Sequence, residues 1–184
     1  MTYTASLPSA EKLARQRKTR LIEQDVREPD GVTVTMLRGA GFTVERRPLV
    51  VGDYAWDIRE QAYLQTHLGY SRFIVERKTL ADLRDVERLA DQLARARGLI
   101  VQERGGDKTY FVVLVEYKWD SDSRRRWSDK AIRSAKLSMQ NGGVRVTECG
   151  ENEVYEAIDS LYIWSQKSKH ELIGNGEDVT TFAP

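Results

Sequence analysis

Three residues in the first half of the chain have types and spacing suited to metal-assisted chemistry. Asp53 lies in the segment VGDY, and Glu76 and Lys78 lie in the segment VERKTLAD. The apolar run before Glu76 predicts a strand, and residues two apart in a strand leave the same face of a sheet. Asp53 follows a glycine and begins an earlier predicted strand. If these two strands pair, Asp53 should lie beside Glu76.

Two carboxylates that meet at the end of a sheet suit a hard divalent cation. Magnesium takes only a few protein oxygens and keeps waters and a phosphate oxygen, and manganese could replace it. Asp25, at the end of the first predicted strand, could supply a third carboxylate. A cation there would activate water, while the Lys78 ammonium could orient that water and stabilise charge on phosphorus. Phosphodiester hydrolysis is therefore one interpretation. A surface acid beside a salt-bridged pair is the other, because this spacing is common.

The rest of the pattern predicts strands that alternate with helices. Strands are expected at 20–24, 42–49, 54–58, 73–75, 110–116 and 144–147, and helices at 32–39, 131–139 and 154–164. The stretch 60–70 lacks periodicity and is expected to be a loop or an irregular hairpin end. Thr79 and Asp82 have the spacing of a capping box, which predicts a helix over 80–99. The expected class is α/β, with a central mixed β-sheet flanked by helices.

Length and composition favour one globular domain. The chain has 184 residues, of which 40% are hydrophobic and 31% charged. We expect a basic N-terminal arm or short helix over 1–18, a folded domain over 19–168 and a flexible tail over 169–184. No segment is apolar for long enough to span a bilayer, so no membrane partner is expected. The single Cys149 excludes an internal disulfide and indicates a reducing compartment, which predicts a cytoplasmic protein.

Positive charge is unevenly placed, although the formal net charge is only +1. One cluster lies before the first strand, and Arg124, Arg125 and Arg126 stand together between Trp119 and Trp127. Either cluster could contact phosphates or could be solvated charge. The two tryptophans could stack on an unpaired base or pack against the sheet.

The chemistry-bearing segments resemble a known motif. Gly52-Asp53 followed by Glu76-Arg77-Lys78 and Asp82 is similar to GDXnERKXXXD, found in the nuclease domain of XPF and Mus-type structure-specific endonucleases and archaeal Hef. The likeness extends in order to Asp25-Val26-Arg27-Glu28, Arg88-Leu89, Gln92 and Val113-Leu114-Val115-Glu116. It implies a restriction-endonuclease-like fold of the PD-(D/E)XK superfamily. It also implies a magnesium-dependent DNA endonuclease that acts at branched, flap or junction DNA in repair or recombination.

The resemblance also implies roles for single residues. Asp53 and Glu76 would be metal ligands, with the Arg77 carbonyl as a further possible ligand and Asp25 as an acidic neighbour of the metal. Lys78 would be the catalytic lysine. Asp82 could serve only the capping box, and Glu116 could pair with Arg77 or Arg27 rather than touch metal. The residues expected to line the site or to contact DNA are Arg27, Arg77, Asp82, Arg88, Gln92, Glu116, Arg124, Arg125 and Arg126.

The chain departs from many of these relatives in its length. It has no room for their helix-hairpin-helix and helicase domains, so a stand-alone nuclease domain that is nucleoid-associated in a prokaryote or phage is expected. Relatives dimerise through the nuclease domain, which predicts a homodimer. The apolar positions of the last predicted helix could equally be explained by burial within one chain. Two alternative functions remain: a non-catalytic DNA-binding or scaffold subunit of a nuclease complex, and a less selective DNA-processing nuclease.

Overall fold

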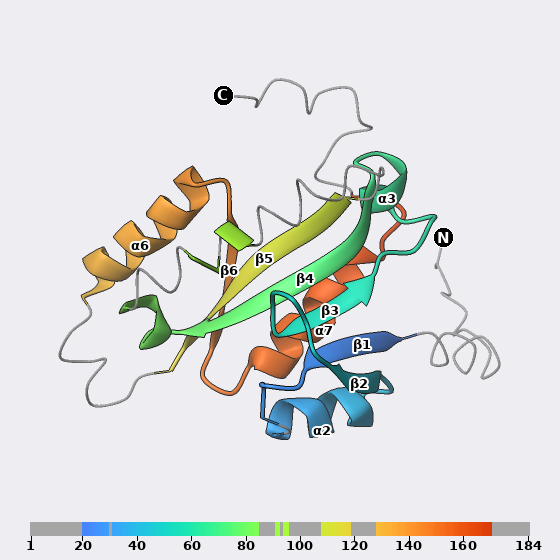
Figure 1. Ribbon diagram of the computed structural model, residues 1–184, viewed down its shortest axis with the longest axis horizontal. Helices are drawn as coiled ribbons and strands as arrows, with labels where there is room; N and C mark the ends of the chain where they lie inside the picture. Colours follow the sequence, from blue (N-terminus) through green and yellow to red (C-terminus); the bar gives the residue numbers. More distant parts are fainter. Residues whose placement is uncertain are drawn as a thin grey trace, which may run out of the picture.

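The computed structural model describes residues 20–29, 31–84, 91–92, 94–95, 108–118 and 128–170. A six-stranded sheet in the order β2-β1-β3-β4-β5-β6 runs through this part of the chain (Figure 1). Its strands are β1 (Leu21–Asp25), β2 (Thr43–Arg47), β3 (Tyr54–Asp57), β4 (Tyr70–Thr79), β5 (Lys108–Tyr117) and β6 (Arg145–Gly150). β3 is antiparallel to β1 and β4, and the other pairs are parallel. The predicted mixed sheet is therefore confirmed.

Helices cover both faces of this sheet (Figure 1). They are α2 (Val32–Gly39), α3 (Tyr63–Thr66), α6 (Asp129–Asn141) and α7 (Val154–Ser165), together with the short 3-10 helix η1 (Asp82–Arg84). Phe73 and Val75 of β4 pack in the core with α2, α3 and α7, whereas Ile74 packs in the core with α6 and η1. Burial on both faces explains the unbroken apolar runs of β4 and β5.

Aromatic packing joins α7 to the middle of the sheet. The Trp56 ring stacks on Phe73 with 4.7 Å between the ring centroids. Its indole Nε1 donates a hydrogen bond to Ser165 Oγ at 2.9 Å, and this hydroxyl donates to the Tyr162 carbonyl at 2.8 Å. The buried indole N–H is thus satisfied, which a core tryptophan requires.

Two local predictions are corrected by the structure. The stretch 60–70 contains α3, a single turn that is too short to produce a helical period in the sequence. α2 has the predicted bounds, with Val34 and Leu37 as its buried residues. His170, which the predicted boundary placed in the tail, is 7% exposed and lies against Trp164 with 4.8 Å between the rings. The folded part thus extends past residue 168.

The capping box is present, but the helical element that begins at Asp82 is the short 3-10 helix η1 rather than the predicted α-helix. Asp82 Oδ2 accepts hydrogen bonds from the Thr79 amide at 2.8 Å and the Thr79 hydroxyl at 2.7 Å. Residues 91–92 and 94–95 are helical. Several segments discussed above lie outside the described residues. They are the basic arm, Arg88, the 119–127 segment with its three arginines and two tryptophans, and the tail after His170. None of the described helices combines the length and apolarity needed to cross a membrane.

Candidate active site

The chemistry-bearing residues meet at one end of the sheet. The register pairs Tyr54 with Val75, so Asp53 at the start of β3 and Glu76 near the end of β4 are neighbours. They line a pocket of about 200 Å³. Its walls are Arg27, Glu28, Val50, Val51, Gly52, Asp53, Glu76, Arg77, Lys78, Asp82, Gln92 and Arg95. Most of the residues that the motif singled out therefore share one pocket.

Asp53 is anchored by the main chain of β4. Its Oδ2 accepts a hydrogen bond from the Arg77 amide at 2.6 Å, and its own amide donates to the Val75 carbonyl at 2.8 Å. The amide and carbonyl of one strand residue point to the same edge, which places the Arg77 carbonyl on the Asp53 side of β4. Burial, followed by the nearby Glu76 and Glu28 carboxylates, raises the pKa of Asp53 to about 8. Without a cation, this carboxyl therefore keeps its proton to a higher pH than a solvent-exposed aspartate does.

Glu76 and Lys78 form a buried ion pair. The Lys78 Nζ donates to Glu76 Oε1 at 2.5 Å, and the two side chains are 8% and 4% exposed, respectively. They lie on the same face of β4, as their spacing predicted. The ammonium group is thereby held inside the pocket, close to both acids.

Gly52 makes the turn into Asp53 with a backbone that other residues avoid. Its φ is +86°, and a Cβ there would lie 2.3 Å from Ile74 Cγ2 and 3.2 Å from the Val75 carbonyl oxygen. Only a residue without a side chain lets β3 approach β4 this closely.

Gly52→Ala is expected to lower the free energy of unfolding by roughly 2–4 kcal/mol, because it combines a positive-φ penalty with a steric clash. Gly143→Ala is the matched control, since Gly143 has a φ of +80° and open space at its Cβ position. That variant should lose only about 1–2 kcal/mol. Urea denaturation measures both, and equal losses would contradict the close approach of β3 to β4.

Asp25 joins three backbone segments behind the pocket. Its Oδ1 accepts hydrogen bonds from the Arg27 amide and Nε, both at 2.7 Å, and its Oδ2 accepts from the Leu49 amide at 2.8 Å. Its own amide donates to the Asp53 carbonyl at 2.9 Å. The Arg27 side chain and then these amides lower the pKa of Asp25 to about 2. These contacts give Asp25 a structural role, and its expected contact with metal stays a prediction.

Glu28 is a pocket residue that the sequence reasoning did not assign to the site. Its Oε2 lies 3.5 Å from Arg77 Nη1, and burial raises its pKa despite this arginine. It also contributes to the raised pKa of Asp53. The only sequence signal was its place in the Asp25-to-Glu28 segment, because spacing alone does not reveal where a turn directs its side chains.

Arg77 points away from Glu76 and Lys78 and ties β4 to β5. Its Nη2 donates to Glu116 Oε2 at 2.5 Å, and its Nε donates to the same oxygen at 3.1 Å. Of the two partners considered for Glu116, the structure therefore shows Arg77. This pair fixes the strand from which Glu76 and Lys78 project.

The remaining predicted residues divide into those at the pocket and those not described. Asp82 caps Thr79 and also lines the pocket. Gln92 lines it as well, and its buried Oε1 has no hydrogen-bond partner among the described residues. Arg95, which was not predicted, lies beside them. Arg88, Arg124, Arg125 and Arg126 are outside the described residues.

The oxygen donors fit a cation that needs few protein ligands. Within the described ranges, no group of three or more His, Cys, Asp or Glu side chains is placed to hold a metal ion. Asp53 and Glu76 are instead two adjacent carboxylates, half-buried and buried respectively, and burial followed by the repulsion from Glu76 raises the pKa of Asp53. Magnesium characteristically uses one or two carboxylates and otherwise binds water and phosphate. This donor set therefore suits magnesium better than it suits a cation that needs a site built wholly from protein ligands.

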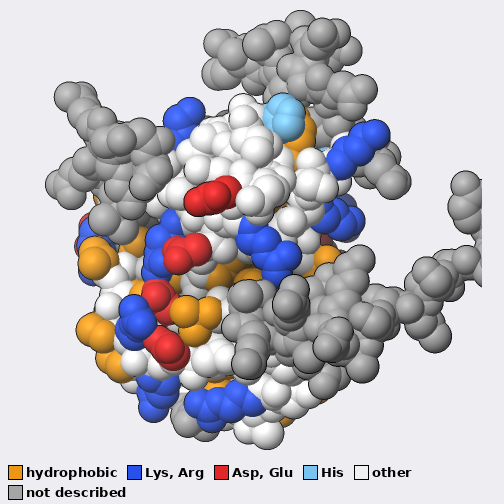
Figure 2. All heavy atoms as spheres, turned by 90° about the vertical axis from the view of Figure 1, so that its right-hand side faces the viewer, with side chains coloured by type: hydrophobic (Ala, Val, Ile, Leu, Met, Phe, Trp, Pro, Cys, Tyr) orange, Lys and Arg blue, Asp and Glu red, His pale blue; other side chains and the backbone are white. Residues whose placement is uncertain are grey.

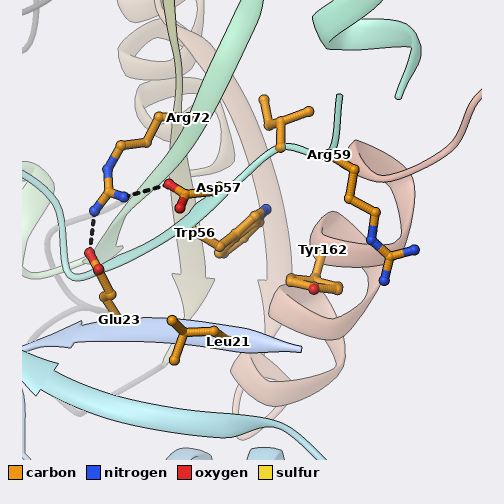
Figure 3. A pocket seen from close by; sticks show the side chains of 8 residues that line it. Leu21, Glu23, Trp56, Asp57, Arg59, Arg72 and Tyr162 are labelled. Carbon is orange, nitrogen blue, oxygen red and sulfur yellow. Dashed lines mark hydrogen bonds and ion pairs between the residues drawn. The ribbon is translucent and has the colours of Figure 1, made fainter. Parts of the chain in front are cut away.

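A second cavity, of about 370 Å³, lies at the other end of β1 and β3 (Figure 3). β1 and β3 pair only at Glu23 with Ala55 and at Gln24 with Tyr54, so the strands separate beyond this point. Arg72 bridges Glu23 and Asp57 in this cavity (Figure 3). The side of the molecule in Figure 2 likewise carries acidic and basic side chains interspersed. The acids of this cavity pair with Arg72, whereas in the catalytic pocket Glu76 pairs with Lys78 and Asp53 accepts a hydrogen bond from the main chain.

Comparisons with known proteins agree with this architecture. A family model described as "ERCC4 domain" matches residues 19–166. The solved structure of XPF from Aeropyrum pernix is 22% identical, with a TM-score of 0.52, and the match covers 77% of this chain and 64% of that one. The same protein in complex with DNA is 23% identical, with a TM-score of 0.53 and coverage of 79% and 64%.

The chain thus spans somewhat less than two thirds of the length of these XPF chains, at 64%. No curated protein sequence matches it. The family match extends from just before β1 to just past α7 and so includes the whole described sheet. The chain belongs to the ERCC4 domain family, with the restriction-endonuclease-like α/β fold of the XPF nuclease domain.

Proposed function

We propose that this protein is a magnesium-dependent DNA endonuclease that hydrolyses phosphodiester bonds at branched, flap or junction DNA. The observation that carries the proposal is the convergence of Asp53, Glu76 and Lys78 in one pocket at the end of the sheet. Membership of the ERCC4 family supports a DNA nuclease, and the DNA complex of the XPF relative supports DNA as the partner. A role in repair or recombination and a cytoplasmic location stay predictions.

The pocket residues have separable roles in this proposal. Asp53 and Glu76 would hold the cation together with the Arg77 carbonyl, and Asp25 keeps Asp53 in place through the main chain. Magnesium, or manganese in its place, supplies Lewis-acid activation of the phosphate and lowers the pKa of bound water. The Lys78 ammonium donates hydrogen bonds to the attacking water or to a phosphate oxygen.

Among the described residues, Arg27 is well placed to receive the DNA backbone at the rim of the pocket. Its side chain is 68% exposed, while Asp25 and the Leu49 carbonyl hold its Nε and Nη2. A guanidinium fixed in this way offers its remaining N–H groups to a phosphate without loss of rotamer freedom on binding.

A cleavage panel tests the proposed function. Purified protein should nick flap, fork and junction DNA in magnesium at least about tenfold faster than linear duplex or single strand, a difference of about 1.4 kcal/mol in transition-state stabilisation. Chelation of the metal should stop the reaction. Equal rates on all substrates would favour the less selective nuclease, and binding without metal-dependent cleavage would favour the scaffold subunit.

We also propose that the protein is a homodimer that uses the face formed by α6, β6 and α7. β6 is at the edge of the sheet, Leu137 of α6 is 64% exposed in the groove on one side of it, and Leu161 and Trp164 of α7 line the groove on the other side. Grooves along both sides of β6 share Thr147 and Glu148, which makes this face continuous. Sedimentation should give a dimer for the native chain and a monomer for Leu137→Glu, while a native monomer would exclude this interface.

A further inference from the structure

Arg46 of the edge strand β2 contacts the turn that carries Arg27 and Glu28. Its Nη2 donates hydrogen bonds to the Val26 carbonyl at 2.7 Å and to the Glu28 carbonyl at 2.8 Å. Two carbonyls of one turn are thus held by one guanidinium nitrogen. Since Arg46 does not line the catalytic pocket, its contacts act on the backbone of the site and not on its chemistry.

The opposite side of this turn is held by Asp25. The Glu28 amide donates to the Asp25 carbonyl at 3.1 Å, and the Asp25 carboxylate accepts from the Arg27 amide at 2.7 Å. The Val26 amide donates to the Arg47 carbonyl at 3.1 Å. The amides of the turn are therefore satisfied by β1 and β2, and Arg46 satisfies the carbonyls of Val26 and Glu28. With the backbone held on both sides, the side chains of Arg27 and Glu28 are directed into the pocket.

We propose that Arg46 is a positioning residue that holds the 25–28 turn so that Arg27 and Glu28 flank Asp53. This inference rests on the proposed nuclease function. Both carbonyls lie near the surface, and water can replace the guanidinium there, so the fold should survive without Arg46. The turn would then move relative to Asp53. A misplacement of about 1 Å at a catalytic site can reduce the rate by roughly 100-fold.

A direct contact between Arg46 and a DNA phosphate is the competing explanation, because Arg46 is exposed. The two explanations differ in kinetics. A phosphate contact contributes to binding, so its loss should raise KM and reduce the salt dependence. A positioning residue acts on the placement of other groups, so its loss should lower kcat with little effect on KM.

Arg47 provides a matched control within the same strand. It is adjacent to Arg46 but projects from the other face of β2. There its side chain pairs with Glu23 at 3.2 Å and with Glu45 at 2.5 Å, away from the turn. Arg47→Met therefore removes the same charge from β2 and, like Arg46→Met, leaves an apolar stem, but it keeps the two contacts of Arg46 to the carbonyls.

The experiment compares Arg46→Met, Arg46→Lys and Arg47→Met in the full chain. Arg46→Met should lower kcat on a forked DNA by roughly tenfold or more with KM within about twofold, and Arg47→Met should stay near the native values. Arg46→Lys restores a donor and should recover part of the lost rate. A raised KM with native kcat would overturn the proposal in favour of the phosphate contact.

Amide hydrogen exchange provides a readout that does not need cleavage. In Arg46→Met, the amides of Arg27, Glu28 and Leu49 should exchange faster than in the native protein, while β4 and β5 stay equally protected. Unchanged exchange at these three amides would overturn the inference even if the enzyme cleaves DNA. If the native protein does not cleave DNA but exchange in Arg46→Met accelerates as expected, the proposed function fails, whereas the conclusion that Arg46 holds the 25–28 turn is supported.

Discussion

Replacing Asp53 by asparagine is expected to lower the rate of magnesium-dependent cleavage by at least roughly 100- to 1,000-fold, because a ligand of the cation is lost. The substitution is nearly isosteric and keeps an oxygen that can accept the hydrogen bond from the Arg77 amide. Single-turnover cleavage of forked DNA at several magnesium concentrations measures the effect. Native cleavage by this variant would exclude Asp53 as a metal ligand.

The same variant has a stability consequence that shows whether it folds. The pKa of Asp53 is raised from 3.8 to about 8, so the folded protein binds this proton more tightly than the unfolded chain does. The resulting stabilisation of the metal-free protein is present below about pH 4 and is lost as the pH rises through about 8. Asparagine cannot ionise, so Asp53→Asn should melt progressively higher than the native protein between pH 5 and pH 9. A melting difference that does not change with pH would contradict the environment described for Asp53.

The affinity for magnesium should depend on the protonation state of Asp53. Because the cation displaces the proton of Asp53, the apparent affinity of the native protein for magnesium should increase as the pH rises toward about 8. Isothermal titration at pH 6.5 and at pH 8.5 measures this change. Proton release on binding should also be larger at the lower pH.

Removal of the lysine is the second large expected effect. Lys78→Met should lower kcat by roughly 100- to 1,000-fold, because the group that stabilises charge on the phosphate is lost. It also leaves Glu76 buried without its ion-pair partner, which can cost about 3–5 kcal/mol in the metal-free protein. Circular dichroism melting with and without magnesium shows whether the cation restores stability.

Lys78→Arg is the control that keeps the positive charge. A planar guanidinium differs from an ammonium in the geometry of its donors, so this variant should fold more stably than Lys78→Met and still cleave at least about tenfold slower than the native protein. Such a result separates chemistry from folding. Native kcat in Lys78→Met would remove the lysine from the proposed mechanism.

The local geometry of the site could be predicted from sequence because it depends on neighbouring residues. The shared face of Glu76 and Lys78 follows from the two-residue period of a strand, and the buried pair in β4 agrees with it. The position of Asp53 beside Glu76 follows from a turn that leads into the adjacent strand. The spacing of Thr79 and Asp82 likewise predicted their contact.

Features that depend on distant segments could not be predicted in this way. Glu28 lies near Asp53 because hydrogen bonds to Asp25 and Arg46 hold the 25–28 turn, which carries Glu28. Asp25 was predicted to be a neighbour of the metal, yet its oxygens accept hydrogen bonds from Arg27 and from Leu49, 24 positions away. His170 is buried because it meets α3 and α7, which no local pattern near the end of the chain encodes.

The most direct test of a cation-dependent nuclease centre is single-turnover cleavage of a labelled forked DNA by excess native protein, with magnesium removed by a chelator and then restored. We predict no cleavage in the chelator, full recovery when magnesium exceeds the chelator, and a rate that saturates with magnesium. Cleavage that persists in the chelator, or its absence at saturating magnesium on a protein that binds the fork, would contradict the assignment of the pocket around Asp53, Glu76 and Lys78.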